Sequence, residues 1–190
     1  TLDGQELDAW LSDVSLIIMD REGSFADFNQ AERFLQNNQP EEAIGRYRRA
    51  QRLREDFWND LIDARLLTAA DRVGRLDESV QGLIRVLQSD AIGPAGAVRF
   101  MPANVPETRN SEAARALEQL DAAILANPLE VQRIVLELTR FEIVRRTRSD
   151  RIDDCARKVA LMPPSKELSM DRVWSIYVDA VELALRAQPS

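Results

Sequence analysis

Residues 39–50 read QPEEAIGRYRRA, and this stretch has the pattern of a helix that packs closely against a neighbour. Pro40 suits the first turn of a helix, where its missing N–H is not needed, and the helix dipole favours the two glutamates that follow it. Ala43, Tyr47 and Ala50 are separated by four and then three residues, so they lie on one face. The small Ala43 lets a second helix approach, and Tyr47 fills the space beside it.

The same pattern recurs along the chain. Small residues equivalent to Ala43 occur at Ser79, Ala116 and Cys155, at intervals of 36, 37 and 39 residues. The residues four positions later are Leu83, Leu120 and Val159. A recurrence of this length predicts stacked helical hairpins, each of which buries its apolar face against the next. At Cys155 this position predicts a buried, inert thiol.

Helical patterns dominate the remaining sequence, and no convincing alternating run predicts a strand. Gly74, Asn127-Pro128 and Met162-Pro163-Pro164 separate the periodic segments. We expect helices at residues 5–20, 24–37, 40–54, 58–73, 76–89, 111–126, 129–148, 151–161 and 167–187. The least helical segment, residues 92–110, contains Pro94, Pro102 and Pro106 and is expected to be a loop.

These features predict an all-α fold, an α-α superhelix of three to four irregular helical hairpins with a capping helix at each end. The whole chain, 1–190, is expected to form a single domain. Its parts are an N-terminal helix (1–23), two hairpins (24–91), a Pro/Gly loop (92–110), degenerate hairpins (111–162) and a capping helix (163–190). The alternative is a non-repeating helical bundle in which the small residues recur by chance.

The first hairpin resembles a tetratricopeptide repeat, a helix-turn-helix unit of about 34 residues. Gln30-Ala31-x-x-Phe34 is similar to the family's Leu-Gly-x-x-Tyr in the first helix, and residues 43–50 are similar to its second-helix signature. The likeness weakens along the chain. Leu67 stands where the second unit should have a small residue, and the first helix of the third unit falls in the Pro/Gly loop.

The resemblance implies a function. In that family the first helices of the hairpins line a concave groove that holds a peptide, so we expect a protein–protein interaction scaffold without catalytic activity. The implied peptide-binding residues are Phe28, Glu32, Leu35, Gln36, Thr68, Asp71, Arg72, Arg140 and Arg148. Phe100 and Met101 in the Pro/Gly loop are further candidates, which either engage a partner or fill the gap left by the missing helix.

Composition excludes several chemistries. The sequence has no His and one Cys, so imidazole chemistry, internal disulfides and Cys-based zinc sites are absent, and we expect no catalytic residues, metal or cofactor. The net charge of −7 disfavours nucleic acid as a partner. No stretch approaches the length of a membrane span, so we expect no direct membrane insertion.

Two other functions stay open at this stage. The first alternative is a structural or assembly subunit, such as a homodimer formed through apolar stripes around Trp10 or Trp174. The second is a helical accessory domain of a larger enzyme. The terminal stripes are otherwise expected to pack as caps. The sequence does not separate a cytoplasmic protein from the soluble domain of an exported one, and we expect any targeting segment to lie outside this chain.

Overall fold

The computed structural model describes residues 25–52, 57–89, 92–107, 110–126, 128–163 and 171–187, and within them the regular elements are all helical. The α-helices are α1 (Ala26–Gln36), α2 (Pro40–Arg52), α3 (Phe57–Arg72), α4 (Leu76–Leu87), α5 (Gly93–Ala97), α6 (Ser111–Leu125), α7 (Glu130–Arg146), α8 (Ile152–Ala160) and α9 (Asp171–Arg186). One 3-10 turn, η1 (Val98–Phe100), follows α5. The all-α prediction is confirmed, and the helix expected at 5–20 lies outside the described residues.

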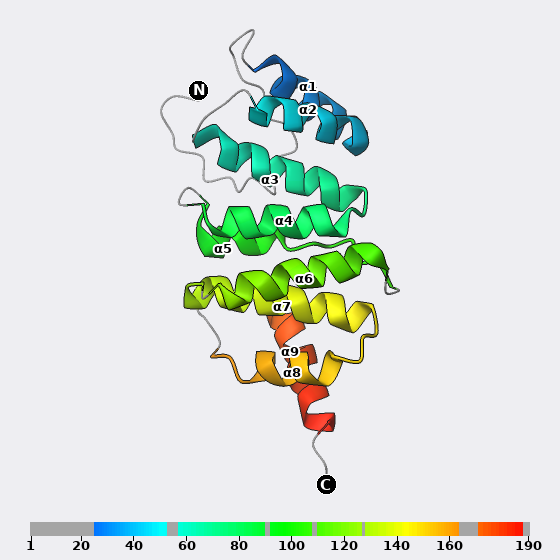
Figure 1. The fold of residues 1–190 in the computed structure, drawn as a ribbon, viewed down its shortest axis with the longest axis vertical. Coiled ribbons are helices and arrows are strands. Elements are labelled where there is room, and N and C mark those ends of the chain that lie inside the picture. Colours follow the sequence, from blue (N-terminus) through cyan, green and yellow to red (C-terminus); the bar gives the residue numbers. More distant parts are fainter. Residues whose placement is uncertain are drawn as a thin grey trace.

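The helices form an elongated stack in which each packs against the next (Figure 1). The first four helices contact one another in chain order, α1 with α2, α2 with α3 and α3 with α4. The helix α4 then contacts α6, α6 contacts α7, and α7 contacts α8. The helix α9 lies against α8 and also contacts α7. None of the described helices combines the length and the apolar character needed to cross a bilayer.

Three of the turns between helices share one geometry. Asn38, Gly74 and Arg148 have positive φ angles of 57°, 74° and 49° and follow the ends of α1, α3 and α7. In each turn the next residue donates its backbone N–H to a carbonyl five positions earlier, at 2.8, 3.0 and 3.0 Å. This is the left-handed cap that ends a helix and reverses the chain. The turns are 36 and 74 residues apart, and 74 is twice 37.

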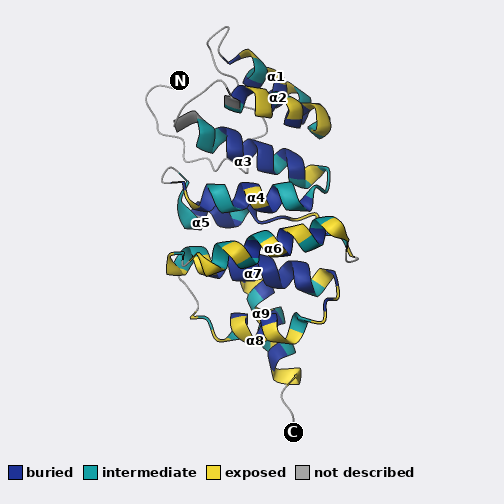
Figure 2. Cartoon of the chain, in the orientation of Figure 1, coloured by how far each residue is buried: buried dark blue, intermediate teal, exposed yellow. Residues whose placement is uncertain are grey.

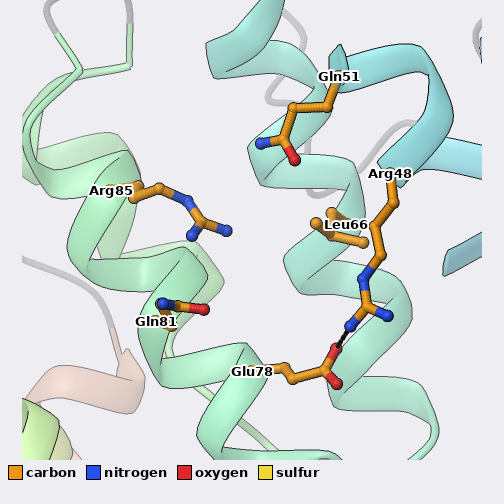
Figure 3. A pocket seen from close by; sticks show the side chains of 6 residues that line it. All are labelled: Arg48, Gln51, Leu66, Glu78, Gln81 and Arg85. Carbon is orange, nitrogen blue, oxygen red and sulfur yellow. Dashed lines mark hydrogen bonds and ion pairs between the residues drawn. The ribbon is translucent and has the colours of Figure 1, made fainter.

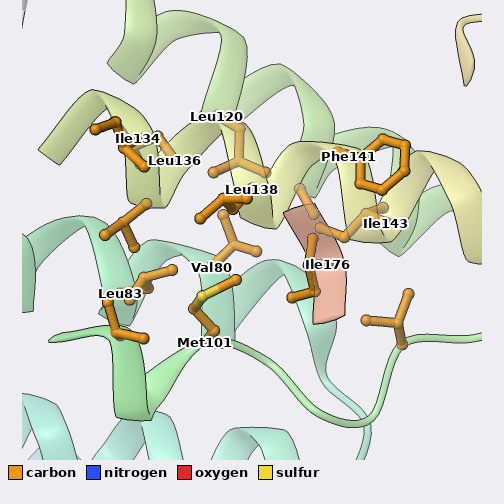
Figure 4. Packing of buried hydrophobic residues seen from close by; sticks show 14 of the residues in the cluster. Val80, Leu83, Met101, Leu120, Ile134, Leu136, Leu138, Phe141, Ile143 and Ile176 are labelled. Carbon is orange, nitrogen blue, oxygen red and sulfur yellow. The ribbon is translucent and has the colours of Figure 1, made fainter. Parts of the chain in front are cut away.

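The apolar core has two parts that meet at α3. The smaller cluster joins α1, α2 and α3, and the larger one runs from α3 to α9. Figure 4 shows the larger cluster, where Leu83 of α4, Leu120 of α6 and Ile176 of α9 converge on α7. The predicted small positions Ala31, Ala43, Ser79, Ala116 and Cys155 are all at most 1% exposed.

Burial explains why α7 lacks the amphipathic pattern of its neighbours. All residues from Ile134 to Val144 are buried, and α3 is likewise buried on most of its surface (Figure 2). Both helices are covered by neighbours on several sides, so polar residues on them must find partners inside the protein.

The expectation of a structureless loop at 92–110 was wrong for its first half. Residues 93–100 form α5 and η1, and Val98, Phe100, Met101 and Val105 belong to the larger core cluster. This segment contacts α3, α4 and α7, and so lies inside the stack of helices. Its prolines and glycines prevent a long helix, but its apolar side chains still bury themselves.

Candidate functional site

The predicted groove residues of α1 are core residues. Phe28, Glu32 and Leu35 are at most 2% exposed, so the expectation that they face a bound peptide must be corrected. Only Gln36 of this set is exposed. The expectation assigned one face of α1 to a partner, whereas that face lies in the apolar cluster that α1 shares with α2 and α3.

Glu32 is the centre of a buried polar network. Its carboxylate accepts two hydrogen bonds from the Arg65 guanidinium, both at 2.8 Å, and a third from the Tyr47 hydroxyl. The side chains of Glu32 and Arg65 are 0% and 2% exposed, and Tyr47 also packs edge-on against Phe28. Burial and the negative charge of Glu32 raise the pKa of Tyr47 well above its ordinary value. The network connects α1, α2 and α3 and has a structural role.

The predicted groove residues of α3 also have partners within the chain. The Thr68 hydroxyl donates to the Ala64 carbonyl at 2.8 Å, and Arg72 donates to the Leu35 carbonyl at 3.1 Å. The Asp71 carboxylate accepts the backbone N–H groups of residues 103 and 104 at 3.0 and 3.1 Å. Burial raises the pKa of Asp71, and these hydrogen bonds act against that shift.

Phe100 and Met101 are not available to a partner, because they are 4% and 3% exposed within the larger core cluster. The chain after them is held from two sides. Asp71 of α3 binds it as described, and Arg172 of α9 donates to the carbonyls of Met101 and Pro102 at 2.7 and 2.5 Å. We expected Phe100 and Met101 either to engage a partner or to fill space in the stack. Their burial agrees with the second alternative.

Arg140 and Arg148 lie in different environments on and beyond α7. Arg140 is 4% exposed, donates to Asp121 at 3.0 Å and forms an ion pair with Glu137. Burial raises the pKa of Glu137 despite the positive charge of Arg140. Arg148 is exposed, but its left-handed backbone belongs to the turn after α7. The predicted site residues therefore do not gather into one groove.

A small hollow of about 240 Å³ lies between α2, α3 and α4 (Figure 3). Its lining residues are Arg48, Gln51, Leu66, Glu78, Gln81 and Arg85. Arg48 pairs with Glu78 at 2.6 Å, and Arg85 pairs with Asp63 at 2.9 Å. Burial raises the pKa of Asp63, although Arg85 counteracts the shift. Because both arginines already have carboxylate partners, this hollow is a poor site for an anionic ligand.

A larger cleft of about 620 Å³ lies between the start of α7 and the end of α8. It is lined by Pro128, Glu130, Arg133, Ile134, Glu137, Lys158, Leu161, Met162 and Pro163. Its volume falls within the range of roughly 300–1,000 Å³ that is typical of ligand sites. The lining combines apolar side chains with two acidic and two basic ones. Glu137 and Lys158 pair with Arg140 and Asp154, so the apolar side chains are the main contact surface for an occupant.

Apolar side chains at this cleft are exposed to solvent. Leu161, in the lining, is 86% exposed, and Leu129, between two lining residues, is 70% exposed. Leu125, at the end of α6, is 84% exposed as well but is not one of the lining residues. Scattered surface leucines are ordinary, but leucines beside a cleft extend its apolar surface. The sequence analysis did not predict this cleft. The signals for it in the sequence were Leu129 and Leu161, which lie outside the periodic apolar stripes, and the helix-ending prolines Pro128 and Pro163.

The described residues contain no cluster of three or more acidic or Cys side chains that could hold a metal ion. Cys155 is buried, as its position in the repeat predicts, and burial raises the pKa of its thiol. No protein-family model, curated protein sequence or solved structure matches the chain.

Proposed function

We propose that this chain is a helical-repeat scaffold that binds a segment of another protein in the cleft between α7 and α8. The proposal keeps the function that the tetratricopeptide resemblance implies but moves the binding site. The occupied positions of the predicted groove support this move, since Asp71, Arg140 and the residues of α1 already have partners inside the chain.

Two features support the repeat architecture in this proposal. The left-handed turns at Asn38, Gly74 and Arg148 recur with a spacing near 36–37 residues or twice that. The small residues that recur along the sequence are buried, as close packing of stacked hairpins requires. A superhelix of irregular hairpins, with the segment 92–105 in place of one helix, accounts for both features.

The observation that carries the function is the cleft with exposed leucines beside it. A small molecule that filled 620 Å³ would leave Leu129 uncovered, whereas an extended or helical segment would contact the lining and the leucines together. Apolar side chains of the segment would enter between Ile134 and Leu161. The charged lining residues Glu137 and Lys158 already pair with Arg140 and Asp154, so the apolar contacts carry the binding.

A selection from a displayed peptide library tests the proposal. Peptides enriched on the wild-type chain are then titrated in solution by fluorescence anisotropy against two variants. Leu161→Glu places a charge in the cleft, and Leu185→Glu places one at another exposed leucine, on α9, as a control; the two side chains are 86% and 63% exposed. We expect Leu161→Glu to weaken binding at least tenfold and Leu185→Glu to leave it unchanged. If no peptide is enriched, or if both variants act alike, the proposed site is wrong.

A further inference from the structure

The helix α9 has two apolar faces. Val173, Ile176, Ala180 and Ala184 are buried against the rest of the stack. On the other face, Trp174, Val178 and Leu185 are 43%, 49% and 63% exposed. Val181 is half-buried and lies between the last two. The stripe predicted to cap the stack consists of Val173, Trp174, Tyr177, Val178, Val181 and Leu185. Only Val173 of these residues is buried, so the prediction was wrong for most of the stripe.

The exposed face has the spacing of a helix–helix seam. Its residues 174, 178, 181 and 185 are separated by four, three and four positions, which places them along one line of the helix. The spacing reads the same in both directions. In an antiparallel pair of α9 helices, Trp174 therefore lies opposite Leu185 of the second copy, and Val178 lies opposite Val181.

The charges on α9 distinguish the two possible directions. Asp171 begins the helix, and Arg186 ends it with a side chain 75% exposed. A parallel pair would place Asp171 beside Asp171 and Arg186 beside Arg186. An antiparallel pair places each Arg186 near the Asp171 of the other copy. Within each copy Arg186 also pairs with Glu182 at 3.3 Å, so in the antiparallel pair its guanidinium would be shared between Glu182 and Asp171 of the other copy, and Asp179 pairs with Arg145.

We infer that the chain forms an antiparallel homodimer through the exposed face of α9. The occupant of that face is a second copy, because the apolar seam is symmetric about its own centre and the charged ends attract only in the antiparallel arrangement. The helix has 16 residues and is about 24 Å long. One helix pair of this length is a small interface, so the dimer should dissociate at micromolar concentrations.

Sedimentation equilibrium between about 1 and 200 µM measures the association directly. We expect the wild type to pass from monomer to dimer over this range and Val178→Glu to weaken association more than tenfold, since it places a carboxylate in the apolar seam. Leu161→Glu, at the cleft between α7 and α8, is the matched control and should leave the mass unchanged. We expect Leu161→Glu to weaken peptide binding but not association, and Val178→Glu to weaken association but not peptide binding. This inference and the proposed function can therefore fail separately.

Charge reversal tests the direction of the pair. Asp171→Arg and Arg186→Asp should each weaken the dimer about three- to fivefold, as expected of an exposed ion pair, and the double reversal should restore it. Each reversal places a charge at the helix end where the dipole disfavours it, so the double variant has the least stable helix of the four proteins. If the double variant nevertheless dimerises again, the recovery must come from the restored ion pair and not from a more stable helix.

Three outcomes would overturn the inference. The first is a wild type that stays monomeric at 200 µM. The second is a double reversal that associates more weakly than either single variant. The third is a thermal midpoint that falls sharply in Val178→Glu at about 1 µM, where the wild type is monomeric, because another part of the same chain would then cover the face.

Discussion

Removing the Arg65 guanidinium should be among the most damaging single changes in this protein. In Arg65→Met the buried carboxylate of Glu32, 0% exposed, would lose two hydrogen bonds of 2.8 Å and its compensating charge. Breaking a buried ion pair by removing one partner costs about 3–5 kcal/mol, because the remaining charge stays away from water. We expect the free energy of unfolding to fall by that amount, which is a large share of the stability of an ordinary domain.

The same reasoning predicts a rescue. If Glu32, Tyr47 and Arg65 are replaced together by Leu, Phe and Met, the three groups that bond to one another are removed together, and neither charge of the ion pair is left without the other. Apolar replacement of a whole buried ionic group is often neutral or stabilising. The triple variant should therefore unfold closer to the wild type than Arg65→Met does, although Tyr47→Phe alone should cost about 1.5–3 kcal/mol.

Urea denaturation followed by circular dichroism at 222 nm measures these differences. Arg49→Met, on the exposed surface of α2, is the control and should change stability by less than about 0.5 kcal/mol. A loss below about 1 kcal/mol in Arg65→Met would refute the reasoning. It would mean that Glu32 reaches water or another partner as readily as the guanidinium. A triple variant as unstable as the sum of the single changes would refute it too.

Three further predictions concern packing and charge. Gly82→Ala should destabilise the fold by about 1–3 kcal/mol, because its new methyl group would lie 2.8 Å from Leu67 Cβ. Gly45→Ala should stabilise the fold by about 0.5–1 kcal/mol, because its new methyl group would have nothing within 4 Å. Thermal unfolding of the two variants compares these effects. Ser79→Ala should stabilise by about 1 kcal/mol in urea titrations, because the buried Ser79 hydroxyl has no hydrogen-bond partner in the described structure. Burial acts to raise the pKa of Glu142, but hydrogen bonds from Arg146 and Arg145 outweigh it and hold that pKa below 4.5. Its charge therefore stabilises the fold above pH 4.5 and ceases to do so as the pH falls through the lowered value, so Glu142→Gln should be less stable than the wild type at pH 7, and the difference should shrink towards pH 3.

The positions of the helices were predictable because their signals are local. Pro40 and Gly74 mark a helix start and a helix end through backbone geometry alone, and the structure places α2 and the end of α3 there. The spacing of Ala43, Tyr47 and Ala50 likewise specifies a buried face without reference to the rest of the chain. Such signals act over a few residues, so a single sequence contains them in full.

The burial of the predicted groove residues was not predictable in the same way, because it depends on residues far apart in sequence. Glu32 and Arg65 are 33 positions apart, and neither has a local signal that marks it as buried. The groove residues were assigned from a regular repeat, in which the first helix of each hairpin stays open on one side. The chain departs from that regularity at residues 92–105, which fill part of the space that a groove requires.

The contact between Arg172 and the carbonyls of Met101 and Pro102 joins residues about 70 positions apart. In a simple array each hairpin meets only its neighbours, and a nascent chain can complete one unit after another as it leaves the ribosome. Here the middle segment receives its last two hydrogen bonds only when α9 has been synthesised. The amino-terminal hairpins can thus mature during translation, whereas the centre of the molecule must wait for its carboxyl-terminal end.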